Sequence, residues 1–213
     1  MPSVPLGHIP RTQPLRPASS RAERAPGDGP PLVYLTLGTV QNRAPVLPVV
    51  ASALASMPIR VLVAIGPDGD PGQLAGLSDN VRVETWVDQA EVIEQWAVVV
   101  SHAGSDTFLG ALAAGRPQLC LPMAADQFRN AEGGRRAGAV LVLEPDEVRP
   151  ESITRAVTRL LTEQSFTVHA CLLGVRGLSS AHHRVTAQFA RRRDGRGGGD
   201  PPTCRSGRVP PRA

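Results

Sequence analysis

The chain has 213 residues, of which 41% are hydrophobic, 3% aromatic, 21 glycine and 21 proline, and its formal net charge is +4. So few aromatic residues and so much glycine and proline exclude a single core along the whole chain, although the length allows one large or two small domains. The positive charge lies at the ends, because residues 31–163 hold 10 Arg against 15 Asp and Glu, so we expect no nucleic-acid-binding domain.

Neither an export signal nor a membrane span is expected. No run approaches the ~18 consecutive apolar residues that a span requires, and the N-terminus lacks an apolar signal core. The three cysteines, Cys120, Cys171 and Cys204, are too widely spaced for a metal motif, and Cys120 lies in an apolar run typical of a core. We therefore expect a cytoplasmic protein without a metal site.

Residues 1–30 are rich in Pro, Arg, Ser and Gly and are expected to be disordered. The first ordered element is then a buried strand at 32–37, which ends at Gly38-Thr39. A helix is predicted from Pro45 to Leu54, with proline in its first turn, and a second strand at 59–65 stops in a turn-forming cluster.

A third, short strand at 81–84 is followed by Trp86. Asp88 and Glu91 then form a partial capping box for a short helix at 89–95.

The fourth strand, at 97–100, leads into the loop His102-Ala103-Gly104-Ser105 and then into a helix with Phe108, Leu109 and Leu112 on one face. A strand, a glycine-containing loop and a helix leave free N–H groups and the positive end of the helix dipole at one point. This pattern predicts a phosphate-binding loop.

The fifth strand, at 117–121, is followed by a loop that carries Asp126 and Gln127. Because ligands bind beyond the C-terminal ends of parallel strands, we expect these two residues and the phosphate-binding loop to face one crevice.

A helix at 126–138, a sixth strand at 139–143 and a helix at 150–161 complete the pattern. Alternating strands and helices predict an α/β fold, a Rossmann-like, doubly wound parallel sheet in one domain over residues 31–163.

Residues 164–190 have a weaker pattern. Phe166–Ala170 can start another helix, but we expect Gly174, Gly177 and Ser179-Ser180 to interrupt it. The change in composition after His169 leaves open whether the rest is encoded in frame. The basic segment 191–213 is expected to be disordered.

Five motifs in order carry a family resemblance. They are Leu35-Thr36-Leu37-Gly38-Thr39, Trp86-Val87-Asp88-Gln89, His102-Ala103-Gly104-Ser105-Asp106-Thr107, Gly115-Arg116-Pro117, and Asp126-Gln127 with Asn130-Ala131. Together they resemble the C-terminal, nucleotide-sugar-binding half of GT-B glycosyltransferases, closest to the family-1 UDP-glycosyltransferases that include bacterial macrolide and other antibiotic glycosyltransferases. The resemblance covers residues 32–163.

This resemblance implies binding of a UDP- or dTDP-sugar and inverting transfer of a hexose to an acceptor hydroxyl, with no metal or other cofactor. Trp86 would stack on the base, and Gln89 would reach the base or ribose. The alternative for Trp86 is that it fills a groove between helix and sheet. Asp126 and Gln127 would bind the sugar hydroxyls, or Asp126 would only cap a helix.

The diphosphate would be bound by residues of two loops. These are His102, Gly104, Ser105, Thr107 and, by a weaker match, Thr39.

Three positions depart from the family pattern. Asp106 stands where the family usually has glycine. Its charge either only stabilises the first helical turn or also repels the diphosphate. Gly110 replaces a glutamate that reaches the ribose in many relatives, and Asp88 replaces a common proline.

The family's acceptor site and general base lie in an N-terminal domain, which residues 1–30 cannot supply, and His8 is not assigned that role. We therefore expect a truncated half-enzyme that is inactive alone, or one completed by a separate acceptor-domain polypeptide. The alternative is a non-catalytic nucleotide-sugar-binding protein or an inactive fragment. A Rossmann dehydrogenase is not expected, because no GxGxxG follows the first strand.

Overall fold

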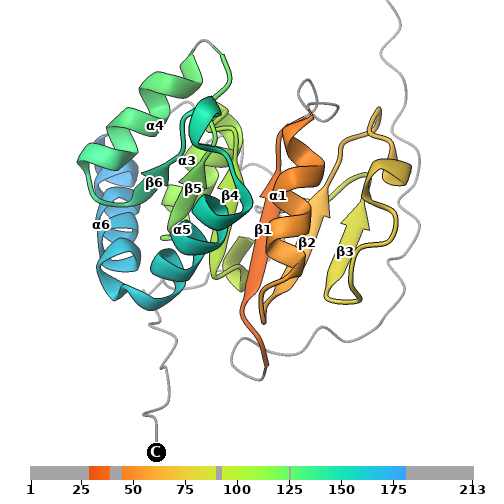
Figure 1. Ribbon diagram of the computed structural model, residues 1–213. Helices are drawn as coiled ribbons and strands as arrows, with labels where there is room; N and C mark the ends of the chain where they lie inside the picture. The colour runs from red at the N-terminus through yellow and green to blue at the C-terminus, as the bar shows by residue number, and fades with distance from the viewer. Residues whose placement is uncertain (1–28, 39–44, 90–92, 125, 181–213) are drawn as a thin grey trace, which may run out of the picture.

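A computed structural model describes residues 29–38, 45–89, 93–124 and 126–180, which form one parallel sheet with helices on both faces (Figure 1). The strands are β1 (Leu32–Thr36), β2 (Arg60–Ala64), β3 (Val81–Glu84), β4 (Val98–Ser101), β5 (Gln118–Cys120) and β6 (Val140–Val142). The helices are α1 (Val46–Ala55), α3 (Ser105–Ala113), α4 (Asp126–Arg136), α5 (Pro150–Thr162) and α6 (Gln164–Ser180), with short 3₁₀ turns at Pro71–Leu74, Ile93–Gln95 and Pro145–Glu147. The predicted Rossmann-like α/β fold is confirmed.

Some predictions fall on residues outside the described ranges. The segment 191–213, His8, Thr39 and nearly all of 1–30 lie there. Of the short helix predicted at 89–95, only Gln89 and the 3₁₀ turn Ile93–Gln95 are described.

The strand order is β3-β2-β1-β4-β5-β6, and every neighbouring pair is parallel. The chain therefore leaves the centre of the sheet in two directions, outward through β2 and β3 and outward through β5 and β6. At the point of reversal, Thr36 of β1 pairs with Ser101 of β4. In parallel sheets of this kind, ligands bind at such a point of reversal, beyond the C-terminal ends of the strands.

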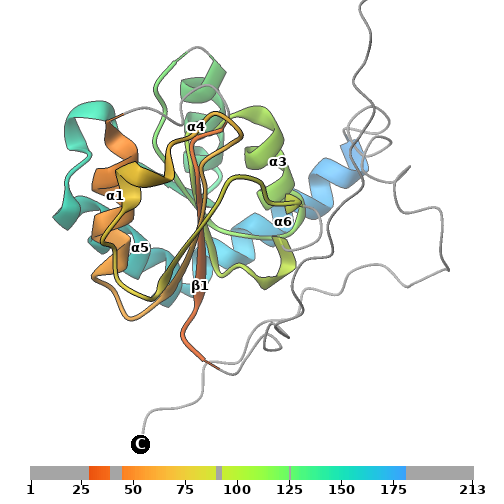
Figure 2. The same cartoon turned by 90° about the vertical axis from the view of Figure 1, so that its right-hand side faces the viewer.

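Alternating side chains divide the core between the two faces of the sheet. Leu35 of β1 packs with Leu54 of α1 and Ile153 of α5, while Tyr34 packs on the other face with Ala111 of α3. Figure 2 shows this arrangement, with α1 and α5 on one side and α3 and α6 on the other. Cys120 is fully buried and unbridged, which confirms its predicted place in the core.

Helix α6 contradicts the expected interruption at Gly174, because it runs unbroken from Gln164 to Ser180. A Cβ at Gly174 would lie 2.5 Å from the carbonyl oxygen of Leu112 and 3.2 Å from that of Ala113. The prediction was wrong because it used the low helix propensity of glycine, whereas here the missing side chain lets α6 approach the end of α3 closely.

Replacing Gly174 with alanine should lower the free energy of unfolding by roughly 1–2 kcal/mol, because the added methyl overpacks the contact with α3 by more than the gain in helix propensity offsets. Urea unfolding would measure this. The matched control is Gly133→Ala in α4, where a Cβ meets no atom within 4 Å, so it should stabilise the protein slightly. Equal effects of the two substitutions would contradict the explanation.

Candidate functional site

The residues singled out from the sequence gather at the C-terminal edge of the sheet. Gly38 follows β1, Trp86 follows β3, His102 and Gly104 follow β4, and Asp126 begins α4 after β5. All these strands run in one direction, so their C-terminal ends lie along one edge. The expectation that the loops after β4 and β5 share an edge is confirmed.

The imidazole of His102 lies between two glycines. A Cβ at Gly38 would stand 2.8 Å from Cε1 of His102, and a Cβ at Gly104 would overlap Nε2. Gly38 also has a φ of +73°, in the left-handed region that favours glycine. Both glycines therefore make the space in which the ring sits.

His102 is neutral near pH 7. Burial lowers its pKa from the usual value, and the negative charge of Asp126 opposes this shift only in part. Its Nδ1 atom is buried and has no hydrogen-bond partner within the described part of the chain. A neutral imidazole has one N–H, so a ligand at this edge could select which nitrogen carries it.

The start of α3 is open to an anion. Gly104 is its N-cap residue and no side chain caps it, so the amides of the first turn keep the partial positive charge of a helix N-terminus. The preceding residue, Ala103, has a φ of +63° and is held by two contacts. Its N–H donates to Ser101 Oγ at 3.1 Å, and its carbonyl accepts from Asn130 Nδ2 at 3.0 Å.

Hydrogen bonds join this helix start to the start of α4. Ser105 Oγ donates to Asp126 Oδ2 at 3.2 Å, and Asn130 Nδ2 donates to Ser105 Oγ at 3.3 Å. The two helix N-termini therefore lie side by side, with the hydroxyl and the carboxylate between them. Asp126 contacts the other loop rather than standing apart from it.

Gln127 holds its own loop together. Its Oε1 accepts from the N–H groups of Met123 at 2.8 Å and Ala124 at 3.0 Å, and the residue is only 9% exposed. Its carbonyl is thus engaged by the backbone, which leaves the amide nitrogen as the group that could face a ligand.

Gln89 turns inward. Its Nε2 donates to the hydroxyl of Tyr34 at 3.2 Å and to Oγ1 of Thr107 at 3.3 Å. Thr107 is buried in the first turn of α3, so this contact links the loop after β3 to that turn. Trp86, three residues before Gln89, is 70% exposed, which does not fit the alternative that it fills a groove between helix and sheet.

Two residues of this edge were not assigned a role from the sequence. Asn130 belonged to a recognised motif, but only the structure shows its contacts with Ala103 and Ser105. Tyr34 is the one tyrosine of the chain and lies inside an apolar strand, where only its type distinguishes it. The presence of its hydroxyl within an otherwise apolar strand was the local sign that Tyr34 has a polar contact.

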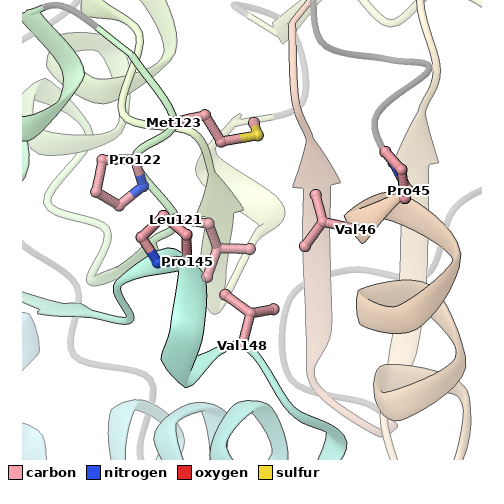
Figure 3. Close-up of a pocket in the computed structure, with 7 residues that line it drawn as sticks. All are labelled: Pro45, Val46, Leu121, Pro122, Met123, Pro145 and Val148. Carbon is pink, nitrogen blue, oxygen red and sulfur yellow. The ribbon is translucent and has the colours of Figure 1, made fainter.

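An apolar pocket of about 270 Å³ opens next to this edge (Figure 3). Its lining comes from the start of α1, the loop after β5 and the segment around the 3₁₀ turn before α5. The lining residues are Pro45, Val46, Leu121, Pro122, Met123, Pro145 and Val148. In Figure 3, Val46 faces Leu121 and Met123 across the pocket. No lining side chain is polar, so an anion is better accommodated by the neighbouring helix N-termini.

Residues 29–38, 45–89, 93–124 and 126–180 contain no group of three or more His, Cys, Asp or Glu side chains that could hold a metal ion. Within the same ranges, no helix has both the length and the apolar character needed to cross a membrane.

The model of the family described as "Erythromycin biosynthesis protein CIII-like, C-terminal domain" matches residues 49–182. The match begins inside α1 and ends just after α6, so it includes the loops that follow β3, β4 and β5. It also continues past His169, where the sequence pattern had become uncertain.

Sequence identity to individual glycosyltransferases supports this family match. The chain is 33% identical over 136 residues to the "PGL/p-HBAD biosynthesis glycosyltransferase" of Mycobacterium tuberculosis (strain ATCC 25177 / H37Ra), which covers 64% of the chain and 31% of that relative. It is 30% identical over 139 residues to the demethyllactenocin mycarosyltransferase of Streptomyces fradiae, covering 65% and 30%. The chain thus spans about a third of the length of these relatives.

A solved structure agrees as well. The spinosyn rhamnosyltransferase SpnG complexed with thymidine diphosphate matches with a TM-score of 0.67 and 26% identity, over 80% of this chain and 47% of that one. The predicted resemblance to bacterial antibiotic glycosyltransferases is confirmed.

Proposed function

This chain belongs to the family of erythromycin biosynthesis protein CIII-like C-terminal domains, and from that membership we propose that it binds the diphosphate of a dTDP- or UDP-sugar. The observation that carries the proposal is the uncapped N-terminus of α3 beside His102. A helix N-terminus favours phosphate because its amides and dipole both stabilise negative charge.

The diphosphate would lie over the loop after β4. The free amides of α3 would bind its oxygens, together with the N–H of His102. The hydroxyl of Ser105 would join them by turning from Asp126 to a phosphate oxygen. A neutral imidazole keeps one N–H, so His102 can donate one hydrogen bond to the diphosphate at neutral pH. Gly104 and Thr107 would add further contacts to the diphosphate there. We also propose Thr39 as a contact of the diphosphate.

The base and the sugar would bind on either side of the diphosphate. Trp86 presents an exposed ring at the end of β3 on which a pyrimidine would stack, with Gln89 next to the base or ribose. Asp126 would accept hydrogen bonds from sugar hydroxyls, and Gln127 would donate from its amide nitrogen.

The reaction would be an inverting transfer. An acceptor hydroxyl would attack the anomeric carbon as the bond from that carbon to the diphosphate oxygen breaks, and its proton would pass to a general base. The donors around the phosphates would stabilise the charge that develops on the leaving diphosphate. We propose that the general base and the acceptor site belong to a separate domain or polypeptide.

Isothermal titration calorimetry with thymidine diphosphate and uridine diphosphate tests this function. We expect saturable binding of at least one of them, accompanied by quenching of Trp86 fluorescence. Trp86→Ala should weaken binding by about 1–3 kcal/mol, the usual contribution of one stacked base. Absence of binding by the unaltered chain would overturn the proposal.

Replacing Asp106 with glycine should tighten binding of the diphosphate. Asp106 is exposed on the first turn of α3, where its charge competes for the same helix dipole. Like charges ~4 Å apart repel by about 1 kcal/mol in water and about 4 kcal/mol near a protein surface, so a gain of about tenfold is reasonable.

Asp106→Asn serves as the control, since it removes the charge and keeps the size. It should reproduce most of the gain, and the gain should shrink at high salt. Equal or weaker affinity in both variants, measured by calorimetry, would show that this carboxylate does not oppose the ligand.

A second candidate is a nucleotide-sugar-binding protein without transferase activity, and the exposed charge of Asp106 favours it. Diphosphate release from a nucleotide-sugar, measured with an acceptor-domain polypeptide added, separates the two. Release supports the enzyme, and binding without release supports the second candidate.

A further inference from the structure

A series of polar contacts runs beneath the candidate site and joins three of its loops. The N–H of Gly38 donates to Thr36 Oγ1 at 3.2 Å, and the Thr36 side chain lies close enough to the hydroxyl of Tyr34 to oppose the rise in its pKa. Nε2 of Gln89 donates to that same hydroxyl at 3.2 Å and to Oγ1 of Thr107 at 3.3 Å. We call these five residues the buried relay.

Each end of the buried relay touches a different part of the site. Gly38 lies against the imidazole of His102, and Thr107 belongs to the first turn of α3. Gln89 is in the loop that carries Trp86. The relay thus connects the side proposed to bind the base with both groups proposed to bind the diphosphate.

Tyr34 is the best-anchored member. It is 1% exposed, and its ring stacks on Trp96 with centroids 3.8 Å apart and planes 8° apart. Burial raises the pKa of its hydroxyl to about 12, so the group stays protonated at physiological pH. Its oxygen therefore offers Gln89 a fixed acceptor.

This acceptor determines which way the Gln89 amide points. Nε2 of the amide has two N–H groups and two acceptors, so both are used below the site. The amide oxygen is then the atom left to meet a ligand, and it can only accept. Without the Tyr34 hydroxyl, one N–H of the Gln89 amide loses its hydrogen-bond partner. The amide group can then rotate so that its nitrogen and oxygen exchange places.

We propose that Tyr34 is a positioning residue for the nucleotide: its hydroxyl orients the Gln89 amide and thereby ties the base side of the donor site to the diphosphate side. The inference rests on the proposed function. It adds a residue that touches no ligand itself.

A double-mutant cycle tests it by calorimetry with thymidine diphosphate and uridine diphosphate. Tyr34→Phe keeps the stacked ring and removes only the hydroxyl, and we expect it to weaken binding about five- to tenfold, the effect of one lost buried hydrogen bond. Gln89→Met should cause a similar loss. Because both act through the same contact, the double variant should bind about as well as either single variant.

Trp96→Phe is the control. It disturbs the same buried ring pair without touching the relay, so it should lower the unfolding temperature and leave the dissociation constant within about twofold. If Tyr34→Phe does not fold, the side-chain amide protons of Gln89 are followed by NMR in the unaltered chain during titration with thymidine diphosphate. Both protons should stay protected from exchange when the ligand binds, and loss of that protection would overturn the inference.

The outcomes separate the two claims. If the unaltered chain binds neither diphosphate, the proposed function fails and the inference fails with it. If the unaltered chain binds but Tyr34→Phe binds equally well, the proposed function stands and the inference is overturned. Fully additive losses in the cycle also overturn the inference, because Tyr34 would then act independently of Gln89.

Discussion

Replacing Gly104 with alanine is expected to weaken binding of thymidine diphosphate by about a hundredfold. The new Cβ would overlap Nε2 of His102, so the imidazole must leave its place between Gly38 and Gly104. The methyl would also stand at the N-cap of α3, next to the amides proposed to bind phosphate. Losing one hydrogen bond to a charged group costs about 1.5–3 kcal/mol, and blocking the helix start adds to that loss.

The matched control for this substitution is again Gly133→Ala, because that position is exposed and lies in the second half of α4, away from the helix start. It should leave the dissociation constant unchanged. Circular dichroism would establish that both variants fold, which Gly104 should tolerate because its φ of −61° suits alanine. Normal binding by Gly104→Ala would show that His102 and the start of α3 do not hold the ligand.

The free energy of unfolding is expected to fall steeply between pH 9 and pH 12. Burial raises the pKa of the Cys120 thiol from 9.0 to about 12 and that of the Tyr34 hydroxyl from 10.0 to about 12. In the unfolded chain both groups lose their protons at the lower, ordinary values. The stability they contribute is therefore complete below pH 9 and pH 10, respectively, and is lost as the pH rises toward 12.

A tenfold change in a proton-dissociation constant corresponds to about 1.4 kcal/mol, so the loss is about 4 kcal/mol for Cys120 and about 3 kcal/mol for Tyr34. Few other groups interfere, since the chain has no lysine and a single tyrosine. Urea unfolding at intervals from pH 8 to pH 12 measures the loss. Cys120→Ala should remove the part that begins near pH 9, and Tyr34→Phe the part that begins near pH 10. If the free energy of unfolding of both variants fell with pH in parallel with that of the unaltered chain, this assignment would be contradicted.

The order of strands and helices could be predicted because each β-strand is an unbroken apolar run bounded by glycine, proline or polar residues. In parallel sheets with both faces covered, this signal is local and strong. It located all six strands to within one residue at each end. The two polar loops were recognised for the same reason, since His102 and Asp126 follow such runs closely.

The contacts inside the site could not be predicted in this way. Nothing local indicates that Gln127 accepts from the N–H groups of its own loop, or that Gln89 points down to Tyr34 rather than out toward solvent. Both amides are short polar groups at loops, and their orientation depends on partners that only the folded chain brings within hydrogen-bonding distance. The glycine at 174 failed as a helix breaker for a related reason, because the surface that approaches it belongs to α3.

By itself, the sequence determined the α/β alternation, the edge of the sheet at which polar residues collect, and the family to which the motifs point, because these depend on short-range patterns of apolar and turn-forming residues. The tertiary structure alone decided that His102 sits between two glycines, that Ser105 meets Asp126, and that a buried tyrosine lies beneath the loop that carries Gln89. Those contacts join strands that are distant in the chain, and parallel pairing at the reversal between β1 and β4 is what brings them together.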